Sequence, residues 1–315
     1  MLCRYFLVLG LLFAVSCKIQ PGSSRHYADG NENKVYKLVL RPKPGTQYYY
    51  DVTNETELQM KINSRDIDNL SRSHTGVVYT FNRDTAGDLL FDMRYDKVDL
   101  YTRNDGVETD LDATKASTSD DPTEKALGVL LSSHVIATVS PIGEVKSITG
   151  YREMTDKIMA SFSQFGPGAQ TATRNKIEQL IGNGIVRKNM DQLFRIFPDS
   201  AVHIGDRWKL GSPQQGELNL KSESQFTLKD IDDGTAQLSS EGKLLGDSAS
   251  VQLMGYTVTP NLKGTQEGEY EMDTHTGMLL GAEINARVEG TIQMMGFDVP
   301  LTFEVHVKMK GQKLR

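Results

Sequence analysis

The sequence has little cysteine, few basic residues and a single tryptophan, and the first two shortages each exclude a class of protein. Only two of its 315 residues are cysteines, which excludes a small fold held together by disulfides. Lys and Arg number 35 against 41 Asp and Glu, for a net charge of −6. Phosphate binding needs clustered basic side chains, so we expect no nucleic-acid partner. The hydrophobic content of 38% is that of a globular protein with a sizeable core.

Long apolar runs are also scarce, and the one that is present lies at the N-terminus. It extends from Tyr5 to Val15, behind Arg4. This run is too short for a membrane helix, which takes about 20 residues to cross about 30 Å of hydrocarbon. Together with the small residues that follow, it predicts a secretory signal peptide over residues 1–16. We expect the remaining chain to be soluble.

The end of this signal predicts a lipid attachment at Cys17. Ala14-Val15-Ser16-Cys17 resembles the lipobox of bacterial lipoproteins, although Ala14 stands where leucine is commoner. Ordinary cleavage after Ser16 is the alternative, and it leaves the same mature start. No cysteine follows Cys17, so its thiol has no disulfide partner within the chain, which favours acylation, for example with palmitate. The acyl chains would anchor the protein to a membrane.

The residues behind the anchor predict a flexible tether. Residues 17–34 hold few large apolar side chains and much Gly, Ser and Asn, too little to build a core. We therefore expect a folded part over residues 35–315, held in the cell envelope on the periplasmic side of the outer membrane.

Alternation of polar and apolar residues predicts two β blocks, over residues 35–150 and 199–315. The segment 47–62 alternates, with Asn54 and Thr56 among the otherwise apolar even positions. The parity shifts at Asp96-Lys97, which indicates a bulge or a turn. Residues 104–124 are acidic and predict an exposed loop, and Ser140-Pro141-Ile142-Gly143 predicts a tight turn.

Between the two blocks, residues 151–198 change to helical spacing and predict two or three short helices. The fold class is therefore mainly β (α+β): curved, half-barrel-like antiparallel sheet, one-sided, with a central block of short helices. The three segments form one composite domain in this interpretation. Gly45 and Gly205 each precede a long strand, and Val52 can be aligned with Leu220, which suggests an internal duplication; two unrelated meanders would look similar.

Residues with recognisable chemistry are few. The six histidines show no metal-ligand spacing, and there is no nucleophile elbow, P-loop or dinucleotide fingerprint. Asp230-Ile231-Asp232-Asp233-Gly234 predicts a hairpin turn rather than a calcium loop. We expect no enzyme, no cofactor and no metal, and so assign no catalytic, cofactor-binding or metal residue; carboxylate pairs for glycoside hydrolysis stay open because folding alone could bring them together.

Three short motifs are similar to an O-glycosylation signal of Asp, Ser or Thr, and a small residue. They begin at Asp84, Asp199 and Asp247, and matches of this length also arise by chance. Ser200 is the candidate acceptor because it lies in a polar stretch between a predicted helix and a predicted strand.

The one-sided sheet suggests the function. Its apolar face needs cover, and the short helices are the available lid. If the sheet curves strongly, the two could enclose an apolar cavity lined by adaptable methionines; the alternative is that the methionines fill a core. We therefore expect non-enzymatic binding of an apolar ligand, or else a structural or accessory lipoprotein that docks another envelope protein.

Several short motifs together resemble a domain-of-unknown-function family of Bacteroidetes-type envelope lipoproteins. The residues that carry the resemblance are Cys17, Pro44-Gly45 with Tyr48, Ser140-Pro141 with Gly143 and Val145, Gly205-Asp206 with Trp208, and Asp273 with Thr276-Gly277. The resemblance implies an envelope location and a β-rich fold, and it brings no catalytic residues.

Overall fold

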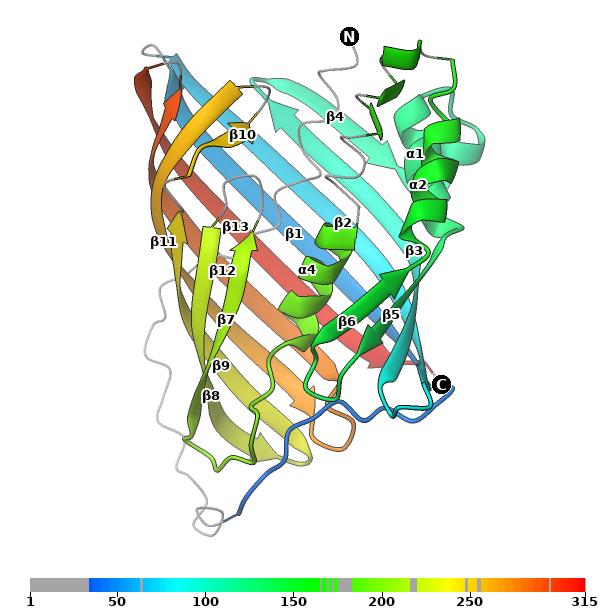
Figure 1. The fold of residues 1–315 in the computed structure, drawn as a ribbon, viewed down its shortest axis with the longest axis vertical. Coiled ribbons are helices and arrows are strands. Elements are labelled where there is room, and N and C mark those ends of the chain that lie inside the picture. Colours follow the sequence, from blue (N-terminus) through cyan, green and yellow to red (C-terminus); the bar gives the residue numbers. More distant parts are fainter. Residues whose placement is uncertain are drawn as a thin grey trace.

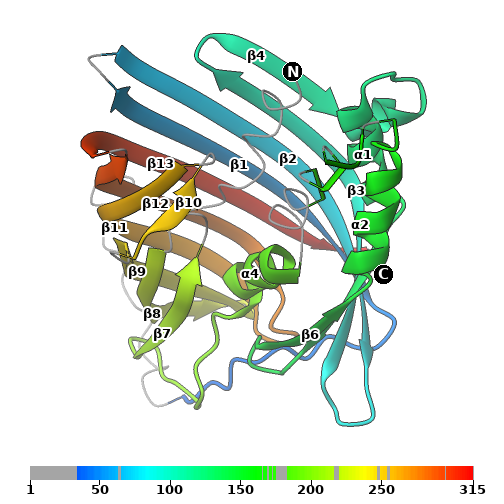
Figure 2. The ribbon, with the colours of Figure 1, turned by 45° about the horizontal axis from the view of Figure 1, so that its top comes forward.

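The protein is built around a single curved antiparallel sheet. The computed structural model describes residues 34–62, 65–164, 166–168, 170–171, 173–174, 183–215, 220–246, 249–253, 256–294 and 296–314. Within these ranges thirteen strands join one sheet, which curves without closing (Figures 1 and 2). The predicted class, mainly β and half-barrel-like with few helices, is confirmed.

The strands fall into two halves along the chain. The first half comprises β1 (Gln47–Ile62), β2 (Arg65–Arg83), β3 (Leu89–Asn104), β4 (Val107–Asp112), β5 (His134–Val139) and β6 (Val145–Thr149). The second comprises β7 (Arg207–Gln215), β8 (Leu220–Asp232), β9 (Thr235–Gly246), β10 (Val251–Leu253), β11 (Tyr256–Asp273), β12 (Leu279–Met294) and β13 (Phe297–Lys313).

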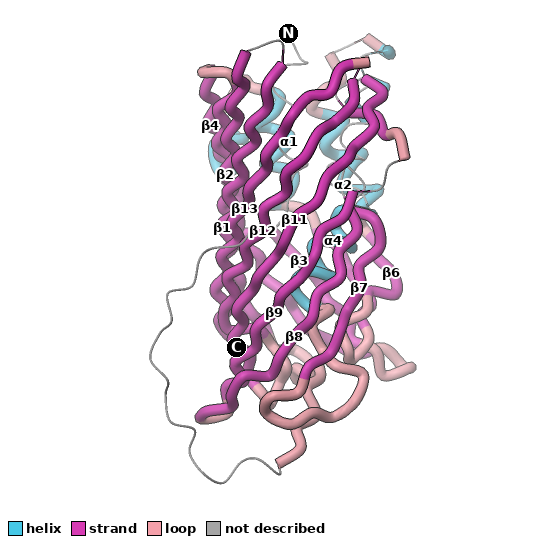
Figure 3. Tube along the Cα trace, turned by 90° about the vertical axis from the view of Figure 1, so that its left-hand side faces the viewer, coloured by secondary structure: helices cyan, strands magenta, loops and turns pink. Residues whose placement is uncertain are grey.

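The two halves meet in the middle of the sheet. The strand order is β6-β5-β3-β2-β1-β13-β12-β11-β9-β8-β7, with β4 paired to β3 and β10 to β11. The first strand therefore lies beside the last, and β6 and β7 form the two edges. Figure 3 shows the long strands as one wall with the helices behind it.

Alternating burial explains why these segments are strands with one dry face. In β1 the side chains of Tyr48, Tyr50, Asn54 and Thr56 are buried, whereas those between them are more exposed. The predicted bulge is confirmed: Val77 pairs with Tyr95 but Gly76 pairs with Lys97, which leaves Asp96 as the extra residue.

The acidic segment 104–124 is not an exposed loop, and this prediction was wrong. It forms β4, the 3-10 turn η2 (Ala113–Ser117) and the start of helix α1 (Pro122–Leu131). Its aspartates act as helix caps: Asp121 Oδ1 accepts a hydrogen bond from the Thr123 backbone N–H at 2.6 Å, and Asp112 does the same for Thr114 at 2.8 Å. The acidic composition therefore reflects helix capping as well as solvation.

Two further helices, α2 (Tyr151–Ala160) and α4 (Asn183–Phe194), lie in the predicted helical block. Helix α1 lies against β3 and β4, α2 against β5, and α4 against β6, so the helices occupy the inside of the curve (Figure 2). Among the described residues, no helix is long and apolar enough to cross a bilayer.

The segment before β1 crosses the lower end of the half-barrel (Figure 1). Tyr36 forms a β-bridge with Val202, and the Leu40 and Arg41 backbone N–H groups donate to the carbonyls of Pro141 and Thr276, each at 2.7 Å. This N-terminal strap (residues 35–43) therefore ties together turns from both halves of the sheet.

Each half of the sheet begins with a glycine that makes the same kind of hydrogen bond. Gly45 donates to the Phe81 carbonyl on β2 at 2.7 Å, and Gly205 donates to the Leu228 carbonyl on β8 at 2.8 Å. The strand order also runs in the same chain direction through both halves. However, Val52 lies on the first strand of its half and Leu220 on the second, so that particular alignment was wrong. The duplication itself stays a hypothesis.

Candidate functional site

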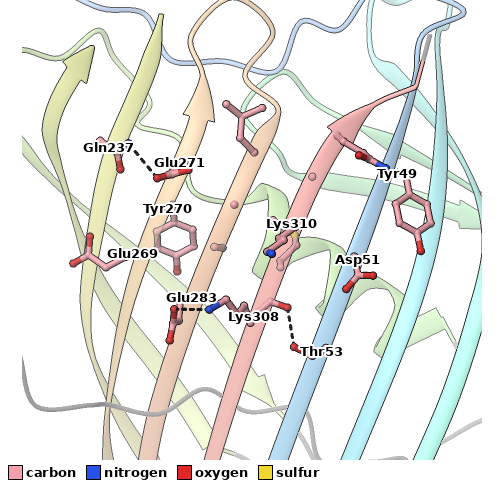
Figure 4. A pocket seen from close by; sticks show the side chains of 16 residues that line it. Tyr49, Asp51, Thr53, Gln237, Glu269, Tyr270, Glu271, Glu283, Lys308 and Lys310 are labelled. Atoms are coloured by element: carbon pink, nitrogen blue, oxygen red, sulfur yellow. Dashed lines mark hydrogen bonds and ion pairs between the residues drawn. The ribbon is translucent and has the colours of Figure 1, made fainter. Parts of the chain in front are cut away.

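An open groove of about 940 Å³ crosses the outer face of the sheet, over β9, β11, β12, β13 and β1 (Figure 4). Its charged side chains are Asp51, Glu269, Glu271, Glu283, Lys308 and Lys310. Lys308 Nζ lies 3.5 Å from Glu283 Oε2, and Gln237 Nε2 donates to Glu271 Oε1 at 3.4 Å. Cross-strand pairs of this kind are typical of a solvated face, so the groove suits a polar partner and not an apolar ligand.

The opposite, concave face carries a cluster of aromatic rings in its lower half. Phe194, the last residue of α4, lies with its ring 5.0 Å from that of Phe91, 5.6 Å from Tyr79 and 6.2 Å from Tyr50. All three pairs are edge-to-face, the arrangement that aromatic quadrupoles favour. The cluster docks α4 onto the concave face and fills that end of the half-barrel.

Above the aromatic cluster, the side chains on the concave face are smaller and more polar. Asn54 and Thr56 lie on the same face of β1 as Tyr50, because side chains alternate along a strand. Following the register from Thr56 across eight strands gives one row: Ser224, Gly242, Gln266, Ala286, Val305, Thr56, Ser71 and Thr102. The row through Asn54 is Phe226, Ser240, Gly268, Ile284, Val307, Asn54, Ser73 and Leu100. We call these two rows the inner belt.

Most inner-belt side chains are small or polar, and those near β8–β11 satisfy one another. Gln266 Nε2 donates to Ser224 Oγ at 3.3 Å, and the hydroxyls of Ser240 and Tyr270 lie 3.3 Å apart. Burial raises the pKa of Tyr270 to about 12, so its hydroxyl stays protonated at neutral pH. This end of the belt is a hydrogen-bonded, closed surface.

The other end of the belt, around β1 and β2, is different. Ser71, Ser73 and Thr75 point to the inside of the half-barrel but are only partly buried, as are Val52 and Val307. Partial exposure on an inward face means that these side chains are not packed against their own chain as tightly as a core requires. The concave face is therefore accessible here.

The three helices are too small to cover the concave face by themselves. At about 3.3 Å per residue and about 4.8 Å between strands, the eleven strands of the main path occupy roughly 2,300 Å². Helices α1, α2 and α4 have 10, 10 and 12 residues. At about 1.5 Å per residue and about 10 Å in diameter, they could cover about a fifth of that area. The three helices therefore do not account by themselves for the burial of the concave face, where Val288 and Ile292 on β12 are only 1% and 2% exposed.

The predicted site residues have separate locations. Cys17 lies outside the described residues, and Ser200 is exposed between α4 and β7. Six of the methionines considered as cavity lining, Met154, Met159, Met190, Met272, Met278 and Met309, belong to the packed core, which accords with the core-filling alternative. Met294 packs partly buried against the core, and Met254 and Met295 lie outside the described residues.

The predicted turn at Asp233-Gly234 connects β8 and β9. His275 and His306 are exposed. Within the described ranges, no three His, Cys, Asp or Glu side chains converge in a way that could hold a metal ion. Asn54 and Ser73 were missed because a polar residue on the dry face of a strand looks, in sequence, like a break in the alternation.

A family model described as a family of unknown function (DUF6263) matches residues 86–279. No curated protein matches the chain. Among solved structures, one titled "Lipid-protein interactions in lipovitellin" is similar with a TM-score of 0.50 and 11% identity, over 86% of this chain and 25% of that chain.

The chain thus spans about a quarter of the lipovitellin chain, and the likeness shows the fold alone. An outer membrane channel from Pseudomonas putida F1 has a TM-score of 0.26 and 5% identity, over 87% of this chain and 97% of the channel. This value is too low to support an argument.

Proposed function

The chain belongs to the DUF6263 family of unknown function, and from this starting point we propose that it is a non-enzymatic protein of the cell envelope that binds an apolar ligand on its concave face. The ligand would lie between the curved sheet and its helices, against the β1–β2 end of the inner belt. We further propose that an acyl chain on Cys17 holds the protein on the periplasmic side of the outer membrane.

One observation carries the ligand proposal. Inward-facing side chains on β1, β2 and β13, namely Val52, Ser73 and Val307, stay partly exposed although they belong to the dry face of the sheet. Accessible apolar side chains on a concave face, with a few polar groups among them, are the usual form of a small-molecule site. Burying it against a ligand would gain roughly 25 cal/mol for each Å² removed from water.

The likeness to lipovitellin supports the same proposal. The printed title of that structure concerns lipid–protein interactions in lipovitellin. The half-barrel of this chain also has a wide apolar face that must be kept away from water. A bound lipid would cover part of that face.

The location rests on the N-terminal sequence. Residues 1–16 have the composition of a signal peptide, and Cys17 follows in a lipobox-like context. These features, together with the turn motifs at Ser140-Pro141 and Thr276-Gly277, are the basis for proposing that the chain is a Bacteroidetes-type envelope lipoprotein.

A second function has one observation in its favour. The outer groove, with paired charges such as Lys308 and Glu283, could dock a polar segment of another envelope protein. Its occupant would be recognised by charge and not by apolar contact, so the two functions use opposite faces of the sheet and need not exclude each other.

A bulky side chain in the inner belt is expected to prevent the ligand from binding. In Ser73→Phe a large ring would occupy the concave face, and the affinity for an anthroyloxy-labelled stearate should fall by at least about tenfold, or about 1.4 kcal/mol. Fluorescence titration measures this. Thr265→Phe places the same side chain on the exposed outer face of β11 and should leave the affinity unchanged. Equal affinities for all three proteins would contradict the assigned face.

Removing the anchor is expected to release the protein. Cys17→Ala should move it from the membrane fraction to the soluble fraction, because several acyl chains bind a bilayer stably whereas the acidic chain itself has no attraction to anionic lipid. Immunoblotting of the fractions measures this. Cys3→Ala, in the signal itself, is the matched control and should stay with the membrane. A Cys17→Ala protein that also stays there would overturn the anchor.

A further inference from the structure

Asn54, in the inner belt, has a buried side-chain oxygen without a hydrogen-bond partner. It lies in the middle of β1 and is 6% exposed, and the unpaired atom is Oδ1. Its neighbours in register are Ser73 on β2 and Val307 on β13. Both neighbours are partly exposed to the inside of the half-barrel.

A buried amide oxygen without a partner is unfavourable. Leaving such an acceptor unpaired costs about 1–3 kcal/mol, and nearly all buried polar groups in folded proteins are paired. A valine or leucine at this position would fit the alternation of β1 and avoid that cost. The acceptor is therefore best explained by a donor that the polypeptide does not supply.

The residues around Asn54 indicate where along a ligand the hydrogen-bond donor would lie. Toward the upper end, the inward-facing residues of β1 beyond Thr56 are Leu58 and Met60. Toward the lower end Val52 is partly exposed, but the next inward-facing residue, Tyr50, packs against Phe194 of α4. At about 3.3 Å per residue, this leaves apolar contacts over roughly 7 Å below the amide and roughly 20 Å above it. A ligand that follows the strand would need apolar segments on both sides and one polar group between them.

We propose that the ligand is an acyl lipid with a hydroxyl group or an amide N–H partway along its length, and that this group donates a hydrogen bond to Asn54 Oδ1. This inference rests on the proposed function and adds the chemical class of the ligand. Val52, two residues away on β1, and Val307, next to Asn54 on β13, would contact the acyl chain, and Ser73 leaves room for it.

Two ligands of equal chain length test the inference. Stearate is entirely apolar behind its carboxylate, whereas 12-hydroxystearate has one hydroxyl partway along the chain. The unmodified protein is expected to bind 12-hydroxystearate about tenfold more tightly, measured by calorimetry or by displacement of a fluorescent fatty acid. Asn54→Leu, which keeps the volume and removes the acceptor, is expected to bind the two lipids equally.

The controls separate the alternatives. Asn285→Leu makes the same exchange on the outer face of β12 and should keep the preference for 12-hydroxystearate. If Asn54→Leu does not fold, Asn54→Val, whose side chain suits a strand, replaces it. Equal binding of the two lipids by the unmodified protein would overturn the inference, as would a preference that persists without the Asn54 amide. If neither lipid binds the unmodified protein, the proposed function itself fails.

Discussion

Phe194→Ala is expected to lower the free energy of unfolding by about 3–5 kcal/mol. The ring is 1% exposed and makes edge-to-face contacts with Tyr50, Tyr79 and Phe91. Its removal leaves a cavity at the place where α4 is attached to the sheet, and the rings around it cannot collapse into the space without losing their own contacts. Urea unfolding followed by circular dichroism measures the change.

A matched control is available for this exchange. Phe297, the first residue of β13, is 68% exposed, and Phe297→Ala should change the stability by less than about 0.5 kcal/mol. If the two variants were equally stable, the aromatic cluster would not be what fastens α4 to the concave face.

Gly143→Ala is expected to destabilise the protein by about 2–5 kcal/mol. Gly143 has φ of 83°, where a side chain costs about 1–2 kcal/mol. An added Cβ would also collide with the backbone carbonyl of Phe194, and overpacking of this kind costs about 1–3 kcal/mol more. The turn between β5 and β6 would have to move away from the end of α4.

Gly45→Ala separates the two contributions. Gly45 has a similar φ of 79°, but an added Cβ would have no atom within 4 Å. This variant should lose only the conformational part, about 1–2 kcal/mol. Thermal unfolding of both variants gives the difference, and an equal loss would mean that the contact with Phe194 contributes nothing.

The strands could be predicted from the sequence because one face of each strand is buried, which leaves an alternation of apolar and polar residues. Segment 47–62 alternates because half of its side chains are buried, and β1 has those bounds. The bulge at Asp96 was visible as a change of parity. The acidic stretch was misread because Asp112 and Asp121 were counted as solvated charges, whereas the Asp-Pro at 121–122 is also a signal for a helix start.

The inner belt could not be predicted because it exists only across strands. Ser224 and Thr102 belong to the same row through pairings that join residues far apart in the chain. The sequence shows each small residue alone, where it has no evident meaning. Asn54 in particular breaks the apolar alternation of β1, and only its burial without a partner marks it as unusual.

The role of the turn motifs also became clear only in three dimensions. Pro141 and Thr276 lie in turns of opposite halves, and both accept hydrogen bonds from the N-terminal strap. Gly277, like Gly143, has no room for a Cβ, which would meet the backbone of Val39. The short motifs of the two halves therefore serve to close the lower end of the half-barrel.

Native mass spectrometry of the unmodified protein, purified gently from membranes, tests the central claim most directly. The account predicts a population that is heavier than the acylated chain by the mass of one lipid, which is released on denaturation and identified by fragmentation. Repeated recovery of the chain without any bound lipid, under conditions that keep the fold intact, would contradict it.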